Sequence, residues 1–198
     1  MSMRVTFLAV VGGVLVAGPV AAQCEPDGEV KFVCGPVSPE DLVVVPDTPW
    51  VLAAGMEADG YLYAVHARTH ESMALFPTAT YRSRPDTLFG DCAGPVTGGF
   101  EPHGLSLRAG ANGRHTLYVV RHGAREAIEV FEVDARVGTP RLTWQGCAEA
   151  PEGVRFNSVT ALPGRGIAAT NFNRPVGELW EWHLNDGWIE VPGSEWDG

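Results

Sequence analysis

The sequence predicts an all-β fold of the propeller type, with about three blades. Short apolar runs recur along the chain and are separated by turns rich in Gly, Pro, Asp and Asn. No segment keeps a helical period, and the 24 Gly and 15 Pro residues are spread over the whole chain, where they end strands and break helices. A similar pair of strands also occurs three times, which is typical of a repeated supersecondary unit.

The first predicted blade covers residues 38–80. Glu40 opens it, a short strand and a Pro-Asp turn follow, and a second apolar strand spans residues 50–55. Two further strands are expected at residues 61–66 and 73–76. This order of polar residue, short strand, turn and apolar strand returns twice later in the chain.

The second predicted blade, residues 100–146, opens at His103, which is 63 residues after Glu40. Its later strands include a six-residue segment, Ile-Glu-Val-Phe-Glu-Val, that alternates between apolar and charged side chains, as a strand does. The three strands that follow the opening one are expected at residues 116–121, 128–133 and 142–144.

The third predicted blade, residues 154–193, opens at Asn157, which is 54 residues after His103. Its later strands are expected at residues 166–171, 179–184 and 188–191. Four strands per unit at a period of about 50 residues are the sequence signature of propeller blades. A β-sandwich also has many short strands, but it does not repeat one turn pattern three times.

In a propeller, the first strand of each blade runs along the central channel. The residues that open these strands here are Glu40, His103 and Asn157. We therefore expect a carboxylate, an imidazole and an amide to converge near one mouth of the channel. Carboxylate and amide oxygens are the ligands that a hard cation such as calcium prefers.

Several segments occur in the order found in the paraoxonase-type arylesterases, which belong to the gluconolactonase/regucalcin superfamily. The chain resembles this family from about Gly28 to Gly198. The resemblance implies a six-bladed propeller that hydrolyses lactones or aryl esters with the help of calcium, although another divalent cation could take its place. The segments that carry it are Pro39–Leu42, Pro102–Ser106, Tyr118–His122, Ile128–Phe131, Phe156–Val159 and Thr170–Phe172.

The resemblance also implies roles for five residues of this chain. Glu40 and Asn157 match ligands of the catalytic calcium, and Asp41 matches a ligand of a second, structural calcium. His103 and His122 match the histidine dyad of the family, in which one imidazole activates the attacking water and the other orients it. Calcium would polarise the substrate carbonyl and stabilise the oxyanion.

The sequence departs from the family pattern in two places. Ser158 stands where paraoxonases have an aspartate on the structural calcium, so the second calcium site is in question. The chain ends at Glu195–Gly198, where family members continue with Asn-Gly, which carries the second asparagine ligand of the catalytic calcium, and later with an aspartate ligand. We therefore expect half of a six-bladed ring, which is either a fragment of a longer reading frame or one of two halves that dimerise.

The N-terminus predicts export from the cytoplasm. Residues 1–22 have a short positive start, an apolar run and small residues before Gln23, which predicts a signal peptide cleaved after Ala22. The apolar run is shorter than a membrane span, so no retained anchor is expected. Lipidation of Cys24 is the alternative, although Gln23 before it is atypical. The expected location is secreted or periplasmic.

Cysteine content and net charge restrict the redox state and the class of binding partner that we expect. The four cysteines allow three disulfide pairings in an oxidising compartment, among which we favour Cys24–Cys34 and Cys92–Cys147. The formal net charge of −10 and the pI near 5.0 argue against a phosphate-binding surface, so we expect no nucleic-acid partner. The expected substrate is the small lactone or ester that the family resemblance implies. No Gly-x-Ser-x-Gly elbow supports a serine hydrolase.

Each candidate residue also has a purely structural interpretation. Glu40 can be an ordinary strand-end carboxylate, Asn157 can cap its own turn, and the two histidines can be satisfied core or turn residues. His66 and His70 have the spacing of a zinc pair, but they fall in a strand end and loop rather than on a helix. The competing function is a non-catalytic exported propeller that binds a partner.

Overall fold

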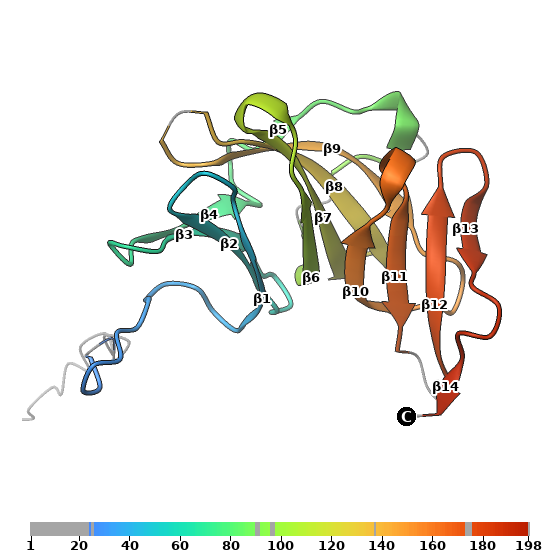
Figure 1. Ribbon diagram of the computed structural model, residues 1–198, viewed down its shortest axis with the longest axis horizontal. Coiled ribbons are helices and arrows are strands. Elements are labelled where there is room, and N and C mark those ends of the chain that lie inside the picture. Colours follow the sequence, from blue (N-terminus) through green and yellow to red (C-terminus); the bar gives the residue numbers. More distant parts are fainter. Residues whose placement is uncertain are drawn as a thin grey trace, which may run out of the picture.

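The computed structural model describes residues 24, 26–89, 92–95, 98–136, 138–172 and 176–197. Within these residues the fold is all-β, as predicted, and consists of three sheets that follow one another in chain order (Figure 1). The predicted signal peptide, residues 1–22, lies outside the described part. No helix among the described residues is long and apolar enough to cross a membrane.

The first sheet is an antiparallel meander of four strands. Turns with proline and glycine follow its first two strands, and the third strand is buried over most of its length. The sheet consists of β1 (Pro39–Val44), β2 (Trp50–Gly55), β3 (Leu62–His66) and β4 (Ser72–Phe76), paired in that order.

The second sheet lies between the other two and has the longest strands. It is an antiparallel meander of β6 (Phe100–Arg108), β7 (Arg114–Gly123), β8 (Ala127–Asp134) and β9 (Arg141–Glu149). The two-residue strand β5 (Arg82–Ser83) pairs with β9 in parallel. Two short 3₁₀ turns, η1 (Thr87–Phe89) and η2 (Ala111–Gly113), lie before β6 and between β6 and β7.

The third sheet repeats the same meander. Its strands are β10 (Phe156–Ala161), β11 (Ile167–Asn171), β12 (Val176–His183) and β13 (Gly187–Glu190), and β14 (Trp196–Asp197) also pairs with β12. A 3₁₀ turn, η3 (Pro163–Arg165), joins the first two strands. Every strand expected from the sequence overlaps an observed strand, whereas β5, β14 and the 3₁₀ turns were not predicted.

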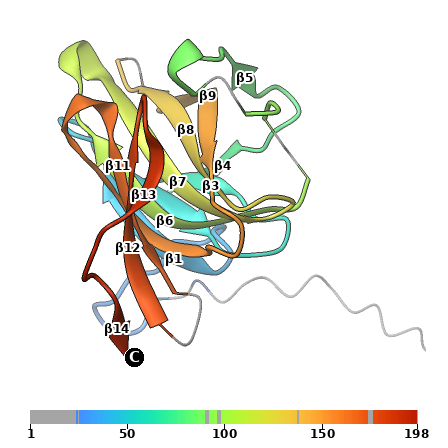
Figure 2. The same ribbon diagram turned by 90° about the vertical axis from the view of Figure 1, so that its right-hand side faces the viewer.

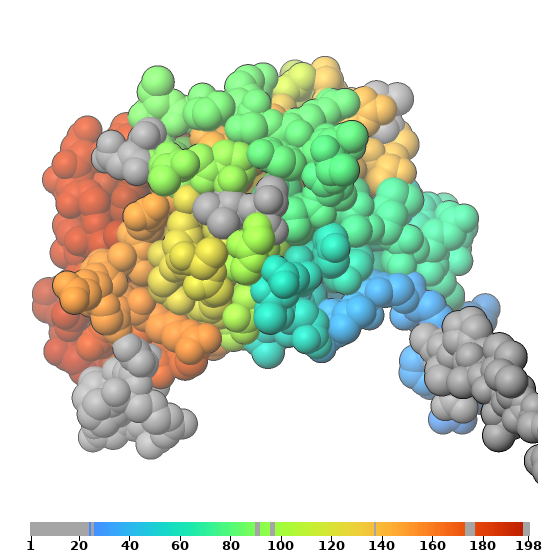
Figure 3. Space-filling view, turned by 180° about the vertical axis from the view of Figure 1, so that it is seen from behind, coloured from blue at the N-terminus to red at the C-terminus, as the bar shows by residue number. Residues whose placement is uncertain are grey.

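The first strands of the three sheets are neighbours in space. β6 contacts β1 on one side and β10 on the other, and it also contacts β2. The outer strands β4, β9 and β13 lie away from this shared side (Figures 1 and 2). Seen from behind, the three sheets cross the surface as successive colour bands from the N-terminal to the C-terminal part (Figure 3).

Two apolar cores hold the sheets together. Phe76 lies at the centre of the first, between the first and second sheets, with its ring edge-on to Phe100 at 5.0 Å and to Phe131 at 4.9 Å. The second core packs Tyr118 and Ile128 of the middle sheet against residues of the third sheet. Because both faces of the middle sheet are covered, several of its polar residues are buried as well, namely His115, Arg121, His122 and Glu129.

The four cysteines form the two pairs that the sequence favoured. Cys24 pairs with Cys34 in the N-terminal segment. Cys92 pairs with Cys147 and so ties the segment before β6 to β9, across 55 residues of sequence. Two such pairs agree with an oxidising compartment.

Candidate functional site

Two predicted site residues, His103 and His122, form a buried pair on neighbouring strands. The Nδ1 atom of His103 lies 3.1 Å from the Nε2 atom of His122, and the two rings meet at 63°. A break in register between Pro102 and Leu105 lets β6 bulge at His103. The exposed fraction is only 12 % for the His103 side chain and 3 % for that of His122. Their contact is therefore largely shielded from solvent.

A carboxylate lies at each end of this imidazole pair. Both Oε atoms of Glu126 lie 2.8 Å from Nδ1 of His122. At the other end, Oε1 of Glu40 lies 3.2 Å from Nε2 of His103. The four groups thus form one continuous array, Glu126–His122–His103–Glu40, which we call the dyad array.

The dyad array contains three donor–acceptor contacts: Glu126 to His122, His122 to His103, and His103 to Glu40. Each of them needs one proton to become a hydrogen bond. Two neutral imidazoles carry only one N–H each, so all three contacts are hydrogen bonds only when the array holds one further proton. The contact to Glu40 is the longest of the three, and the Glu40 side chain is 37 % exposed. An array with two protons therefore leaves His103 Nε2 as the nitrogen with a free lone pair, at the solvent edge.

Phe172 covers both imidazoles from the third sheet. Its ring centre lies 6.5 Å from that of His103 and 6.1 Å from that of His122, edge-on to each. The guanidinium of Arg155 lies over the same ring, 5.5 Å from its centre. Phe172 is 40 % exposed, so it presents an apolar surface beside the histidines.

Asp41, predicted as a ligand of a structural calcium, joins β1 to β6 by hydrogen bonds. Its Oδ2 atom accepts from the backbone N–H of Leu105 at 2.7 Å, and Oδ1 accepts from that of Leu42 at 2.7 Å. The carboxylate therefore has a structural role without any metal. Its role as a calcium ligand stays a prediction.

Asn157 lies on β10, directly against the bulge of β6. A Cβ atom on Gly104 would stand 2.5 Å from the carbonyl oxygen of Asn157, so only glycine allows β10 to approach His103 this closely. Asn157 is half-buried, and Ser158 beside it is exposed. The structure thus brings Glu40, His103 and Asn157 together on three adjacent strands.

The side-chain oxygens of Glu40 and Asn157 are of the type that a hard cation binds. Glu40 offers carboxylate oxygens and Asn157 an amide oxygen, which are the donor types of calcium sites. Calcium takes about six to eight oxygens, so these two side chains supply part of a coordination shell. Their role as ligands stays a prediction.

Glu126 was not among the residues expected from the sequence. It faces His122 because β7 and β8 form a hairpin in which Arg121 pairs with Ala127, and this register places residues 122 and 126 opposite each other. The two strand-forming segments on either side of the turn carried this information in the sequence. A hairpin centred on Ala124 pairs residue 122 with residue 126 and so predicts the contact between His122 and Glu126.

The zinc interpretation of His66 and His70 gains no support. His66 Nδ1 accepts the backbone N–H of Thr69 at 3.1 Å, and its ring lies edge-on to Trp50. His70 adopts a positive φ of 61° in the turn between β3 and β4. Both residues shape a surface connection, as the structural interpretation expects.

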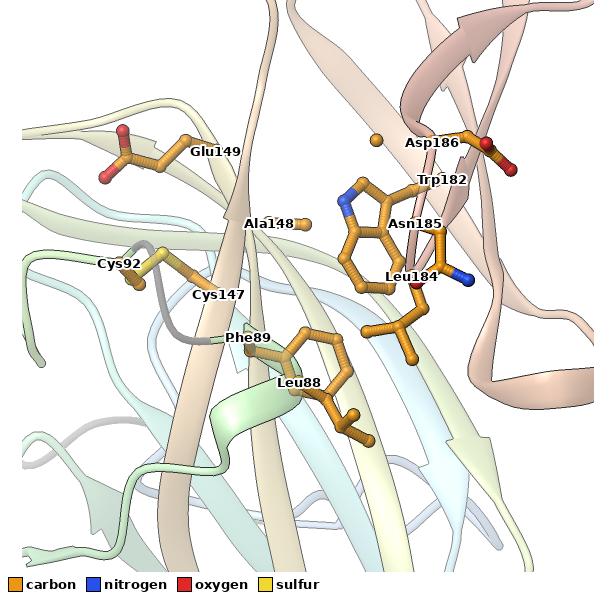
Figure 4. Close-up of a pocket in the computed structure, with 11 residues that line it drawn as sticks. Leu88, Phe89, Cys92, Cys147, Ala148, Glu149, Trp182, Leu184, Asn185 and Asp186 are labelled. Atoms are coloured by element: carbon orange, nitrogen blue, oxygen red, sulfur yellow. A yellow bond between two sulfur atoms is a disulfide. The ribbon is translucent and has the colours of Figure 1, made fainter.

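A hollow lies between the middle and third sheets, and no residue of the dyad array lines it (Figure 4). Its volume is about 410 Å³, and Phe89 stacks on Trp182 in it at 5.2 Å. Cys92, Cys147 and Glu149 line one wall at distances that could suit a metal, but both sulfurs belong to the disulfide. A thiolate ligand is therefore excluded in this state.

No family model matches the chain, and no curated protein matches it significantly. Function is therefore argued from the dyad array and its surroundings.

Proposed function

We propose that this chain is part of a calcium-dependent hydrolase of lactones or aryl esters. The observation that carries the proposal is the buried His103–His122 contact with a carboxylate at each end. Such an array prepares one imidazole nitrogen to accept a proton from water, which is the task of a general base in ester hydrolysis.

The fold supports a propeller interpretation. Each sheet contains a four-stranded antiparallel meander, to which β5 adds in the second sheet and β14 in the third, and the first strands β1, β6 and β10 lie side by side, as the inner strands of propeller blades do. We propose that the three sheets are three blades of a six-bladed ring. The dyad array would then face the central channel.

The residues of the array divide the catalytic work. His103 Nε2 lies at the solvent edge and would take the proton from the attacking water. His122, buried behind it, would hold the His103 ring through the 3.1 Å contact. Glu40 and Asn157 would hold calcium, and the bound ion would polarise the substrate carbonyl. Phe172 would pack against the apolar part of the substrate.

The proposed location is outside the cytoplasm, in the periplasm or the secreted fraction. The apolar N-terminus and the two cysteine pairs support this proposal independently, because one concerns export and the other the redox state of the compartment.

Turnover measured with and without calcium tests the proposal. The protein would be produced with export to an oxidising compartment, and hydrolysis of phenyl acetate and of a simple lactone would be followed. We expect hydrolysis that is lost with a chelator and restored by calcium. Calcium binding without turnover of either substrate would favour the non-catalytic binding module. A protein that neither binds calcium nor hydrolyses either substrate would overturn the proposal.

A further inference from the structure

Glu126 makes a denser set of contacts than any other carboxylate near the histidines. Its two Oε atoms both lie 2.8 Å from His122 Nδ1, and Oε1 also accepts the backbone N–H of Phe156 at 3.0 Å. Phe156 opens β10 in the third sheet, and its own side chain is fully buried. The carboxylate is therefore held from a second sheet while it contacts the imidazole.

The backbone contact determines which partner donates to Glu126. A carboxylate that accepts a backbone N–H is an acceptor, so the hydrogen bond to His122 is filled when Nδ1 of that imidazole carries the proton. In a neutral ring, His122 Nε2 is then an acceptor. Nε2 lies 3.1 Å from Nδ1 of His103, which therefore donates to it. The lone pair of the second ring is thereby left on His103 Nε2.

We propose that Glu126 is the positioning residue of the dyad: it fixes His122 in the Nδ1–H tautomer and thereby leaves the free lone pair of His103 on Nε2, beside Glu40. The tautomer part stands on the contacts alone, whereas the catalytic consequence rests on the proposed hydrolase function. A residue that orients a histidine base in this way has large effects on turnover in other hydrolases, although it does not touch the substrate.

Two substitutions separate the charge of Glu126 from its hydrogen bond. Glu126→Gln keeps one carbonyl oxygen, which must serve both His122 and Phe156. Glu126→Ala removes both acceptors. Glu181→Gln is the matched control, because Glu181 Oε2 also contacts a histidine nitrogen, Nε2 of His183, at 3.1 Å, but on an exposed part of the third sheet.

The direct readout is the tautomer of His122, measured by long-range proton–nitrogen NMR on histidine-labelled protein at about pH 8.5, where an ordinary imidazole is neutral. We expect a protonated Nδ1 in the wild type and in Glu181→Gln, and loss of that signal in Glu126→Ala. A wild-type His122 protonated at Nε2, or a tautomer unchanged in Glu126→Ala, would overturn the positioning role.

Kinetics then test the consequence. With phenyl acetate, Glu126→Ala should lower kcat about 100-fold or more and change KM little, with Glu126→Gln between it and the wild type. Equal kcat in the wild type and Glu126→Ala would overturn the catalytic part. If the tautomer responds as expected but the wild type hydrolyses nothing, the proposed function fails and the structural role of Glu126 stands. Thermal unfolding of each variant identifies any loss of fold.

Discussion

Arg121 and Glu129 form an ion pair that is cut off from water. Nη1 of Arg121 lies 3.0 Å from Oε1 of Glu129, and their side chains are 0 % and 3 % exposed. Burial lowers the pKa of Arg121, and the charge of Glu129 opposes that shift. Glu129 also accepts from Arg125 and from the indole N–H of Trp144, so one carboxylate serves two guanidinium groups.

Removing the charge of Glu129 should strongly destabilise the protein. Glu129→Gln leaves two guanidinium groups without their counter-charge, and breaking a buried pair in this way costs about 3–5 kcal/mol. The control is Glu132→Gln on the same strand, whose partners Arg84 and Arg114 are largely solvated, and about 1 kcal/mol or less is expected there. Urea unfolding measures both, and equal losses would contradict the special role of Glu129.

Asp41→Ala should loosen the contact between the first two sheets. The N–H of buried Leu105 loses its acceptor, which costs about 1–3 kcal/mol. Asp59→Ala is a matched control, because Asp59 accepts the N–H of Gly99 at an exposed position and should cost less. If Asp41 binds a second calcium, added calcium should raise the Tm of the wild type more than that of Asp41→Ala, which keeps only the proposed site at Glu40 and Asn157. An equal rise in both would exclude Asp41 as a ligand.

The two disulfides should contribute unequally to stability. Cys92–Cys147 closes a loop of 55 residues and ties η1 and β9 together, so replacing both cysteines by serine should cost about 4 kcal/mol. Cys24–Cys34 closes only 10 residues in the N-terminal segment, so its double replacement should cost less. Thermal unfolding compares the two double variants, and the reverse order would contradict the assignment.

Glu178 should make the third sheet acid-sensitive. Hydrogen bonds from Asn171 and then from Trp180 lower the pKa of Glu178 below its ordinary value of 4.5. A carboxyl group with a lowered folded-state pKa stabilises the fold above its unfolded-state pKa, and this contribution is lost as the pH falls through the folded-state value. The stability difference between the wild type and Glu178→Gln should therefore shrink on acidification below about pH 4.5. A constant difference would show that Glu178 is not the group responsible.

The strands could be predicted because local signals determine them. The alternation in residues 128–133 and the glycine and proline turns place β8 and its neighbours within a few residues. The two-residue strands β5 and β14 carry no such pattern, since tertiary pairing alone creates them. Alternation also could not reveal that Glu129 is buried, because that depends on both faces of the middle sheet being covered.

The candidate site was predicted in part. The repeat placed Glu40, His103 and Asn157 at equivalent positions, and the structure brings their strands together. The contact of Glu126 with His122 depends on hairpin register, and that of Phe172 depends on how the third sheet packs on the second. The hollow beside Cys92–Cys147 involves an irregular segment and a turn from another sheet, which sequence periodicity does not describe.

The most direct measurement of the central claim is the initial rate of phenyl acetate hydrolysis at saturating calcium, for the wild type and for His103→Gln side by side. His183→Gln, which alters a surface histidine, serves as the control. We predict a rate that falls about 100-fold or more in His103→Gln and is unchanged in His183→Gln, because only His103 carries the nitrogen at the solvent edge of the dyad array. Equal rates in the wild type and His103→Gln, or no hydrolysis by the wild type, would contradict it.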